Sequence, residues 1–339
     1  MLVFSIIGTL IGAGFASGQE MYLFFYRFGI FGILGLLLCS SLMALVIHKT
    51  FIIIHEKNIS NYQDFLNEIF YKGSNKPKNK YFNLSYISNI IVNAFLLATF
   101  YIMISGFGAY FEQQFNISKM LGAGILVCVC FFVLIKDIEG VKKVNSIVVP
   151  ILICIILIIS FMNIKNIDIN KISLKHNYNW IIQAIVYCSY NMILVIPVLV
   201  GLKKYVKNKK QIKLISIASG LIVFVLAINI FLWLTNINIS FDNLEMPAVY
   251  VIDTKFPNFS WIYGIVILLS IFSTAISIGI SFLKNITKNK NNYPQIVAIM
   301  CISGVLISNI GFSNLVKLLF PMFGYLGIIQ IERICTDHK

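Results

Sequence analysis

The sequence predicts an all-α integral membrane protein with about ten transmembrane helices, built as one domain over residues 1–339. Hydrophobic residues make up 58% of the chain and charged residues only 12%, whereas about a quarter of a soluble domain is charged. The apolar residues gather in runs of the roughly 20 residues that cross a bilayer. These observations exclude an ordinary soluble domain, and no polar stretch is long enough to form a separate one.

The first apolar segment, residues 2–28, is rich in glycine at its centre. The centre reads I-G-T-L-I-G-A-G-F-A-S-G-Q-E and includes Gly12, Gly14 and Gly18. Glycine costs a helix interior about 1 kcal/mol relative to alanine, so this stretch is a poor continuous helix. The segment lacks the basic leader and small-residue cleavage site of a signal peptide, and we expect it to remain in the protein.

We therefore expect the first crossing to be broken into two half-helices, at about 1–11 and 18–28. A backbone N–H or C=O that faces lipid unpaired costs several kcal/mol, so a break must be buried in protein or line a polar cavity. The pattern Ser17-x-x-Glu20 is typical of a capping box, in which Ser17 accepts from the Glu20 N–H and the carboxylate bonds back to Ser17. Such a cap predicts a helix N-terminus, with its partial positive charge, near the bilayer midplane.

Nine further crossings and two interfacial helices are expected along the rest of the chain. The crossings are expected at about 29–54, 84–111, 118–136, 141–163, 179–201, 212–235, 260–284, 294–311 and 313–332. Residues 60–70, after the second crossing, place their apolar side chains on one face, which predicts a short amphipathic helix. A counterpart at 246–252 follows the seventh crossing, on the opposite side of the membrane.

The distribution of basic residues predicts the orientation. When the loops are assigned alternately to the two sides of the membrane, 20 of the 27 lysines and arginines fall on the side of the termini and 7 on the other. Because basic residues collect in cytoplasmic loops, both termini are expected in the cytoplasm. This topology explains the net charge of +14, and we expect no nucleic-acid partner.

The sequence shows no recognisable enzyme motif. The seven cysteines fall mostly within apolar spans and form no C-x-x-C pair, so neither a disulfide framework nor a zinc site is expected. We also find no HExxH helix, no phosphate-binding loop and no Ser/His/Asp set. We expect a protein that is not an enzyme and that carries no organic cofactor.

The string G-T-L-I-G-A-G-F-A-S-G-Q-E, followed by about ten spans, resembles the YkvI family of bacterial membrane proteins. That family is similar to the amino acid–polyamine–organocation superfamily, whose members have the LeuT-type fold of two inverted five-helix repeats. The resemblance covers essentially the whole chain. It implies repeats at 1–163 and 179–332, breaks in the first and sixth helices, and a place in the bacterial cytoplasmic membrane.

The sixth span is expected to mirror the broken first span. It carries Tyr187, Ser189, Tyr190 and Asn191 at mid-span, and Pro197 has no N–H to donate to the preceding turn. One interpretation is a solute site formed by these polar groups together with the first break. The other is polar contact between helices, which serine and asparagine commonly supply in membrane bundles.

The predicted solute site joins the two mid-span clusters. Its residues are Gly12, Ala13, Gly14, Ala16, Ser17, Glu20, Ser189, Tyr190 and Asn191. Glu20 is the only acidic residue deep in an apolar span of the first half, and ionisable groups inside a membrane are costly and often functional. Its carboxylate has three alternative roles: the capping box, acceptance of a proton, or contact with an amine of the solute.

The eighth span carries a stripe of hydroxyls. Ser270, Ser273, Thr274 and Ser277 share one helical face, and hard cations are bound by oxygen. LeuT-type sodium symporters hold one sodium between the first and eighth helices. The ligands implied by the resemblance are the carbonyls of Gly8, Ile11 and Ser270 and the hydroxyls of Ser273 and Thr274. Packing of small side chains bonded to their own preceding turn is the alternative.

Other coupling arrangements stay open. Some superfamily members use a lysine of the fifth span in place of this sodium. Lys142 and Lys143 are the candidates, but they lie at the cytoplasmic end of the span, where the orientation rule alone explains them. The leucine transporter uses an asparagine for a second sodium, and that position is Phe15 here. A second sodium is therefore not expected.

The sequence favours a secondary transporter that moves a small polar solute by alternating access with Na⁺ or H⁺ coupling. Hydroxyl, amide, aromatic and carboxylate groups at the predicted site suit an amino acid or an amine. The alternative is a ligand-sensing receptor subunit on the same scaffold, similar to the germinant-receptor permease subunits of spore formers. Net flux of the solute against a gradient separates the two. The expected partners are the small-molecule solute and the lipid bilayer.

Overall fold

A computed structural model of the chain describes residues 2–71, 84–136, 139–163, 179–235, 241, 244–287 and 292–336. This part of the chain folds into helices joined by turns and short extended segments, with no strand in it. The fold class predicted from the sequence is therefore confirmed.

The first crossing is broken, as predicted. It consists of α1 (Leu2–Leu10), α2 (Ala13–Ala16), α3 (Gln19–Phe24) and the 3-10 turn η1 (Tyr26–Phe28). The two interruptions fall at residues 11–12 and 17–18, within the glycine-rich centre of the segment. The local weakness of a glycine-rich helix thus becomes an actual gap in the helix.

The other helices follow in the expected order. They are α4 (Ile30–Glu56), α5 (Tyr62–Tyr71), α6 (Leu84–Phe115), α7 (Lys119–Lys136), α8 (Glu139–Asn163), α9 (Asn179–Leu202), η5 (Lys203–Tyr205), α10 (Lys209–Leu234), α11 (Pro247–Lys255), α12 (Pro257–Ile286), α13 (Tyr293–Ile307), η7 (Ser308–Ile310) and α14 (Phe312–Thr336).

These helices make a multi-pass membrane protein. Seven of the described helices are long and apolar enough to span a bilayer: α4, α6, α9, α10, α12, α13 and α14. Shorter apolar stretches lie in α7 and α8, at Lys119–Ile135 and Ile147–Met162. With the broken first crossing, these account for the ten crossings predicted from the sequence.

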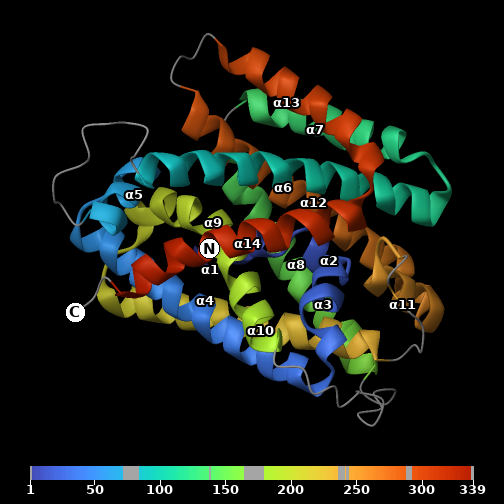
Figure 1. Cartoon of the computed structure of the whole chain (residues 1–339). Coiled ribbons are helices and arrows are strands. Elements are labelled where there is room, and N and C mark those ends of the chain that lie inside the picture. The colour runs from blue at the N-terminus through green and yellow to red at the C-terminus, as the bar shows by residue number, and fades with distance from the viewer. Residues whose placement is uncertain are drawn as a thin grey trace.

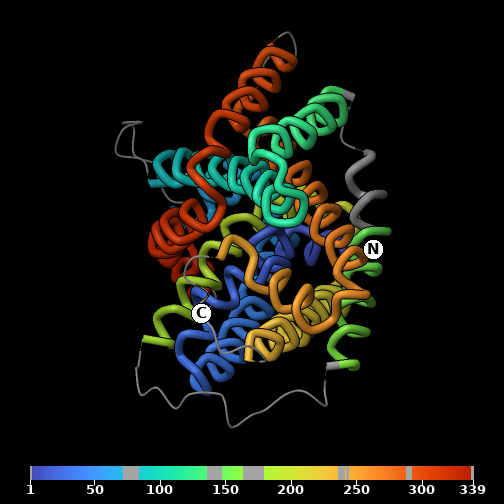
Figure 2. Tube along the Cα trace, turned by 90° about the vertical axis from the view of Figure 1, so that its right-hand side faces the viewer, coloured from blue at the N-terminus to red at the C-terminus, as the bar shows by residue number. Residues whose placement is uncertain are grey.

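The first crossing lies in the middle of the bundle in both views (Figures 1 and 2). Its α1 packs against α8, α9, α10 and α12, while α9 also packs against α4 and α14. The pair α7 and α13 lies at one edge of the bundle (Figures 1 and 2). The interrupted backbone is therefore surrounded by protein, which is where a break at this depth is tolerated.

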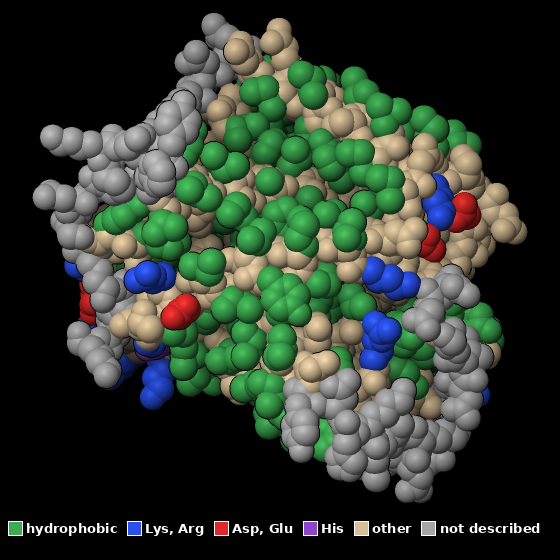
Figure 3. Space-filling view, viewed as in Figure 1, with side chains coloured by type: hydrophobic (Ala, Val, Ile, Leu, Met, Phe, Trp, Pro, Cys, Tyr) green, Lys and Arg blue, Asp and Glu red, His purple; other side chains and the backbone are tan. Residues whose placement is uncertain are grey.

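The outer surface matches a lipid environment. On the face shown in Figure 3, apolar side chains cover the middle and charged side chains gather toward the two sides. Large apolar side chains on several helices are exposed, among them Phe132, Leu214 and Ile299. An apolar belt of this extent on a soluble monomer would be exceptional, and here it faces the acyl chains.

The predicted break in the sixth helix is wrong. The helix α9 runs without interruption through Pro197. Its mid-span polar groups bond to the preceding turn: the Ser189 hydroxyl donates to the Ile185 carbonyl at 2.7 Å, and the Asn191 amide donates to the Tyr187 carbonyl at 2.9 Å. Because these side chains are satisfied within the helix, and no glycine lies beside them at mid-span, mid-span polarity does not require a broken backbone.

Both predicted interfacial helices form. The helix α5 buries Phe65, Leu66 and Ile69 on its inner face. In α11, the Ala248 N–H donates to the Ser17 carbonyl at 2.7 Å. The helix α11 therefore rests directly on the interrupted segment of the first crossing.

Candidate functional site

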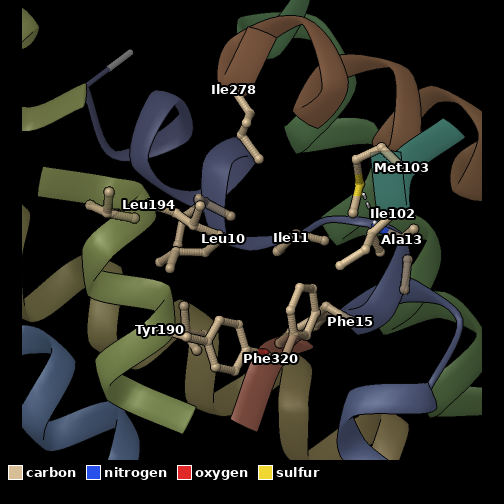
Figure 4. Close-up of a cluster of buried hydrophobic side chains, with 14 of the residues drawn as sticks. Leu10, Ile11, Ala13, Phe15, Ile102, Met103, Tyr190, Leu194, Ile278 and Phe320 are labelled. Atoms are coloured by element: carbon tan, nitrogen blue, oxygen red, sulfur yellow. Dashed lines mark hydrogen bonds between the residues drawn. The ribbon is translucent and has the colours of Figure 1, made fainter. Parts of the chain in front are cut away.

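The backbone is extended between α1 and α2, and side chains of neighbouring helices, such as Met103, Tyr190 and Phe320, lie around it (Figure 4). Gly12 has φ −97° and ψ −166°, and the Ala13 N–H donates to the Met103 sulfur at 3.4 Å. A Cβ built on Gly12 would lie 3.3 Å from side-chain atoms of both Met103 and Thr274. The break is therefore packed closely against α6 and α12, and a side chain larger than that of glycine would crowd both helices at this position.

Carbonyl oxygens released by the break meet hydroxyls of α12. The Thr274 hydroxyl lies 3.1 Å from the Gly8 carbonyl and 3.1 Å from the Ile11 carbonyl. The Ser270 hydroxyl donates to the Ile11 carbonyl at 2.7 Å. In a continuous helix, both carbonyls would accept from the next turn. Here the hydroxyls of a neighbouring crossing take that place.

The structure thus brings together four of the five residues predicted for the Na⁺ site, namely Gly8, Ile11, Ser270 and Thr274. Ser270 differs in detail, because its hydroxyl and not its carbonyl reaches the break. The fifth residue, Ser273, offers its carbonyl to the Ser277 hydroxyl at 2.9 Å within α12.

The chemistry of this cluster fits a small hard cation. Its converging atoms are all oxygens, which such cations prefer. The Thr274 hydroxyl now donates its proton, but a hydroxyl can rotate and offer a lone pair instead. The Gly8 and Ile11 carbonyls, with the Ser270 and Thr274 hydroxyls, would then hold the ion. Occupation by Na⁺ stays a prediction.

Glu20 is buried in α3 and binds two tyrosines of α9. Its Oε2 accepts from the Tyr187 hydroxyl at 2.9 Å and from the Tyr190 hydroxyl at 2.7 Å. Only 3% of the residue is exposed, and within the described residues it forms no ion pair. A buried carboxylate is costly unless it is hydrogen-bonded, and the phenols meet that need in part.

The predicted capping box is wrong. The cap of α3 is Gly18, with φ 78° and no capping side chain. The Ser17 hydroxyl accepts from the Gln19 N–H at 3.3 Å and donates to the Gly14 carbonyl at 3.2 Å. The Glu20 carboxylate turns to the tyrosines instead. Partners on another helix outcompete the local motif that the spacing suggests.

Two glycines permit this arrangement. A Cβ on Gly14 would lie 2.1 Å from the Glu20 carboxylate, so the carboxylate folds directly over that glycine. At Gly18 the left-handed backbone disfavours any side chain, and a Cβ would also lie 2.9 Å from the Ala248 side chain. The glycines of the motif therefore serve close approach as well as interruption.

Three contacts at the site escape sequence reasoning. Tyr187 shares Glu20 with Tyr190, and the spacing of three residues is the only sequence signal that they lie on one helical face. Tyr263 of α12 donates its hydroxyl to the Ala16 carbonyl. Met103 accepts from the first N–H of α2. These contacts depend on tertiary placement, which spacing along the chain does not encode.

The side chains of Lys142 and Lys143, the lysine candidates of the fifth span, lie outside the described part of the chain.

A polar network joins the elements around α11. Lys119, at the start of α7, pairs with Glu112 of α6 at 3.1 Å and with Glu245, before α11, at 2.9 Å. The other oxygen of Glu245 accepts from the Ser313 N–H at 2.6 Å, at the start of α14. The Ser313 hydroxyl in turn accepts from the Gln19 amide at 2.8 Å. This network connects the broken crossing to four other elements.

The opposite end of the first crossing opens into a cleft of about 480 Å³. The cleft lies between α1, the end of α9, the end of α12 and the start of α5. Its lining includes Ser5 and Thr9 of α1, Ser277 and Ser281 of α12, and Gly201 of α9. Thr9 follows directly after Gly8, whose carbonyl belongs to the oxygen cluster.

Together, a broken central crossing, oxygen atoms shared with the eighth crossing and a cleft at one end define a membrane protein of the LeuT-type fold. The solved structure of MhsT in complex with L-phenylalanine has this fold. It is similar with a TM-score of 0.72 at 13% sequence identity, over 97% of this chain and 87% of that chain.

The particular relatives are proteins of Bacillus subtilis (strain 168). The chain is 28% identical to the uncharacterized membrane protein YkvI, over 97% of this chain and 93% of that protein. It is 27% identical to the uncharacterized protein YyaD, over 95% of this chain and 92% of that protein. No protein-family model matches the chain. The resemblance to YkvI that the glycine-rich string suggests is therefore confirmed over nearly the whole length.

Proposed function

We propose that this protein is a secondary active transporter that moves a small polar solute across the membrane by alternating access. The observation that carries the proposal is the interrupted first crossing, whose Gly8 and Ile11 carbonyls meet the Ser270 and Thr274 hydroxyls. Broken helices of this kind hold solute and coupling ion in secondary transporters. A structural bundle has no need of such a break.

Coupling to Na⁺ is the form that the oxygen cluster supports. Four oxygens from two crossings converge without a carboxylate among them, and Thr9, the next residue after Gly8, lines the cleft. A cation bound there would hold α1 to α12. Its binding and release would therefore shift the equilibrium between conformations in which the two helices are in contact and conformations in which they are apart. The cation would supply charge and a tether, while the chain supplies the oxygens.

The solute would lie beside the break, with an amino acid or an amine as the class that fits. The Glu20 carboxylate offers an acceptor, and Tyr187 and Tyr190 hold it in place. The Tyr190 ring stacks on Phe320 of α14 with centroids 4.6 Å apart, which gives an apolar wall (Figure 4). The bound amino acid in the MhsT structure supports the same class.

The two ends of the first crossing differ in a way that suits alternating access. The α11 end is held shut by the network around Lys119, and the other end opens into the cleft. With both termini in the cytoplasm, as the lysine distribution predicts, this conformation would open inward. Transport would require the network to break while the cleft closes.

Uptake by purified protein in proteoliposomes tests the proposal. Radiolabelled amino acids and amines that raise the melting temperature of the protein would be offered with an inward gradient of Na⁺, K⁺ or choline. We expect accumulation above equilibrium with Na⁺ alone. Binding without any accumulation would favour a receptor subunit, and equal accumulation in all three gradients would overturn the Na⁺ site.

A further inference from the structure

The floor of the cleft is lined by hydroxyls that already donate their protons to backbone carbonyls. Thr9 Oγ1 donates to the Ser5 carbonyl at 3.0 Å, and Ser277 Oγ donates to the Ser273 carbonyl at 2.9 Å. Ser281 Oγ, nearer the opening, donates to the Ser277 carbonyl at 2.9 Å. A hydroxyl that has donated its proton offers lone pairs. Thr9 and Ser277 are buried, so the deep part of the cleft presents hydrogen-bond acceptors.

The rim of the same cleft presents donors and positive charge. Lys204 and Lys284 line it with exposed side chains, and Lys204 lies over the Tyr205 ring at 5.2 Å. The amide nitrogen of Asn285 is buried without a hydrogen-bond partner and belongs to the same lining. Among the described residues that line the cleft, none is acidic. The polarity therefore reverses from acceptors at the floor to cationic donors at the rim.

We propose that this cleft is a solute-binding site in its own right, separate from the break, and that it takes a small zwitterion with the ammonium inward and the carboxylate at the lysine rim. The proposal rests on the proposed function, since it concerns a solute on its way to or from the cytoplasm. Its volume of about 480 Å³ lies within the roughly 300–1,000 Å³ typical of small-molecule sites.

The reversed polarity selects against ligands with a single charge. An amine without a carboxylate would satisfy the floor but meet two lysines at the rim. A carboxylate without an amine would satisfy the rim but press its oxygens against the lone pairs of Thr9 and Ser277. A molecule with both charges a few bonds apart satisfies both ends. A bare Na⁺ ion meets the same opposition from the lysines as the amine does.

A reporter cysteine at Gly201 measures occupation of the cleft. Gly201 lines the cleft, and a Cβ built there meets no atom within 4 Å. Full-length Gly201→Cys protein in nanodiscs would be treated with a membrane-impermeant maleimide, and modification of residue 201 would be followed by peptide mass spectrometry. The probes are leucine with isoamylamine and isocaproate, and phenylalanine with phenethylamine and hydrocinnamate, at matched concentrations.

We expect an amino acid to slow labelling at least threefold, while its amine and its acid do not. In the same background, Lys204→Gln and Lys284→Gln should each raise the apparent dissociation constant about fivefold, which corresponds to the loss of one exposed ion pair. Lys213→Gln, an exposed lysine on α10 outside the cleft, is the charge-matched control and should leave protection unchanged.

Three results would overturn the proposal. They are protection of residue 201 by the acid alone equal to that by the amino acid, no protection by either amino acid, or a loss of protection in Lys213→Gln equal to that in the cleft variants. The unliganded labelling rate and the melting temperature of each variant show whether it is folded, so a misfolded lysine variant would be replaced by Lys→Met. Failure here is distinguishable from failure of the transport proposal. Uptake without protection of residue 201 would leave the transporter standing, and protection without uptake would leave the cleft site standing.

Discussion

The central residue of the account is Glu20, a carboxylate buried between α3 and α9. Both phenols bond to the same oxygen, Oε2, and the carboxylate lies over Gly14. Hydrogen bonds to a charged group contribute about 1.5–3 kcal/mol each. The phenols therefore fix the direction of the carboxylate, and under the proposed function a proton or a solute amine would complete its coordination.

Tyr190→Phe should reduce both stability and uptake, because it leaves Glu20 with one phenol. We expect a loss of about 1.5–3 kcal/mol in the interaction with the carboxylate, and a fall in uptake of about tenfold or more. Proteoliposome uptake and melting temperature are the measurements. Tyr101→Phe is the matched control, because its hydroxyl bonds Ser303 on α13 at 2.7 Å. An equal loss of uptake in the control would contradict a special role for the Glu20 pair.

At this scale, sequence reasoning singled out Glu20 and Ser17 but did not predict their contacts. Glu20 was singled out by its depth in an apolar span and Ser17 by the spacing Ser17-x-x-Glu20, and the capping box inferred from that spacing is wrong. The carboxylate bonds Tyr187 and Tyr190, which lie more than 160 residues away along the chain. A local motif such as the capping box includes only partners within a few residues along the chain. A buried charge instead accepts hydrogen bonds from whichever donors the tertiary fold places next to it.

At the scale of elements, the account depends on the contrast between a broken first helix and an unbroken sixth. Gly12 and Gly18 weaken the first helix, and packing against α12 and α11 stabilises the gaps. In α9, Pro197 removes one donor but the helix continues. The glycine cluster was a sufficient signal for a break, whereas one proline with polar neighbours was not.

Gly12→Leu should abolish uptake without preventing membrane insertion. The leucine side chain would enter space held by Met103 and Thr274, which already lie 3.3 Å from a Cβ at this position. Uptake and the size-exclusion profile in detergent are the measurements. Gly124→Leu is the control, since a Cβ at Gly124 on α7 meets nothing within 4 Å. Normal uptake by Gly12→Leu would show that the break is not part of the site.

Lys119→Met should loosen α11, because Lys119 links Glu112 and Glu245 across the closed end. The lysine is half-buried, and each half-exposed ion pair contributes about 0.2–1 kcal/mol, so amide exchange in α11 should accelerate a few-fold. Hydrogen–deuterium exchange of residues 247–255 measures this. Lys57→Met, which removes the exposed pair with Glu68 near α5, should leave α11 unchanged. An unaltered exchange rate in Lys119→Met would mean that the network does not hold this end shut.

At the scale of the whole molecule, apolar run length and glycine content were enough to predict the crossings and the first break, while the LeuT-type fold followed from the resemblance to the YkvI family. The ten crossings, the order of the two interfacial helices and the broken first crossing follow from the sequence, because a bilayer allows few solutions for an apolar chain. The cleft and the α11 network did not follow, since each combines side chains from four or more elements. Such sites exist only once the crossings are packed.

The most direct test of the central claim, that the broken first crossing and α12 together form an ion site, is the melting temperature in NaCl against KCl at equal ionic strength. A ligand at about 100 times its Kd stabilises by about 2.7 kcal/mol, so we predict that Na⁺ raises the wild-type melting temperature by a few degrees. Thr274→Val should lose this shift, and Thr99→Val should keep it, because Thr99 bonds only within α6, to the Phe95 carbonyl at 2.8 Å. A full sodium shift in Thr274→Val, or none in the wild type, would contradict the account.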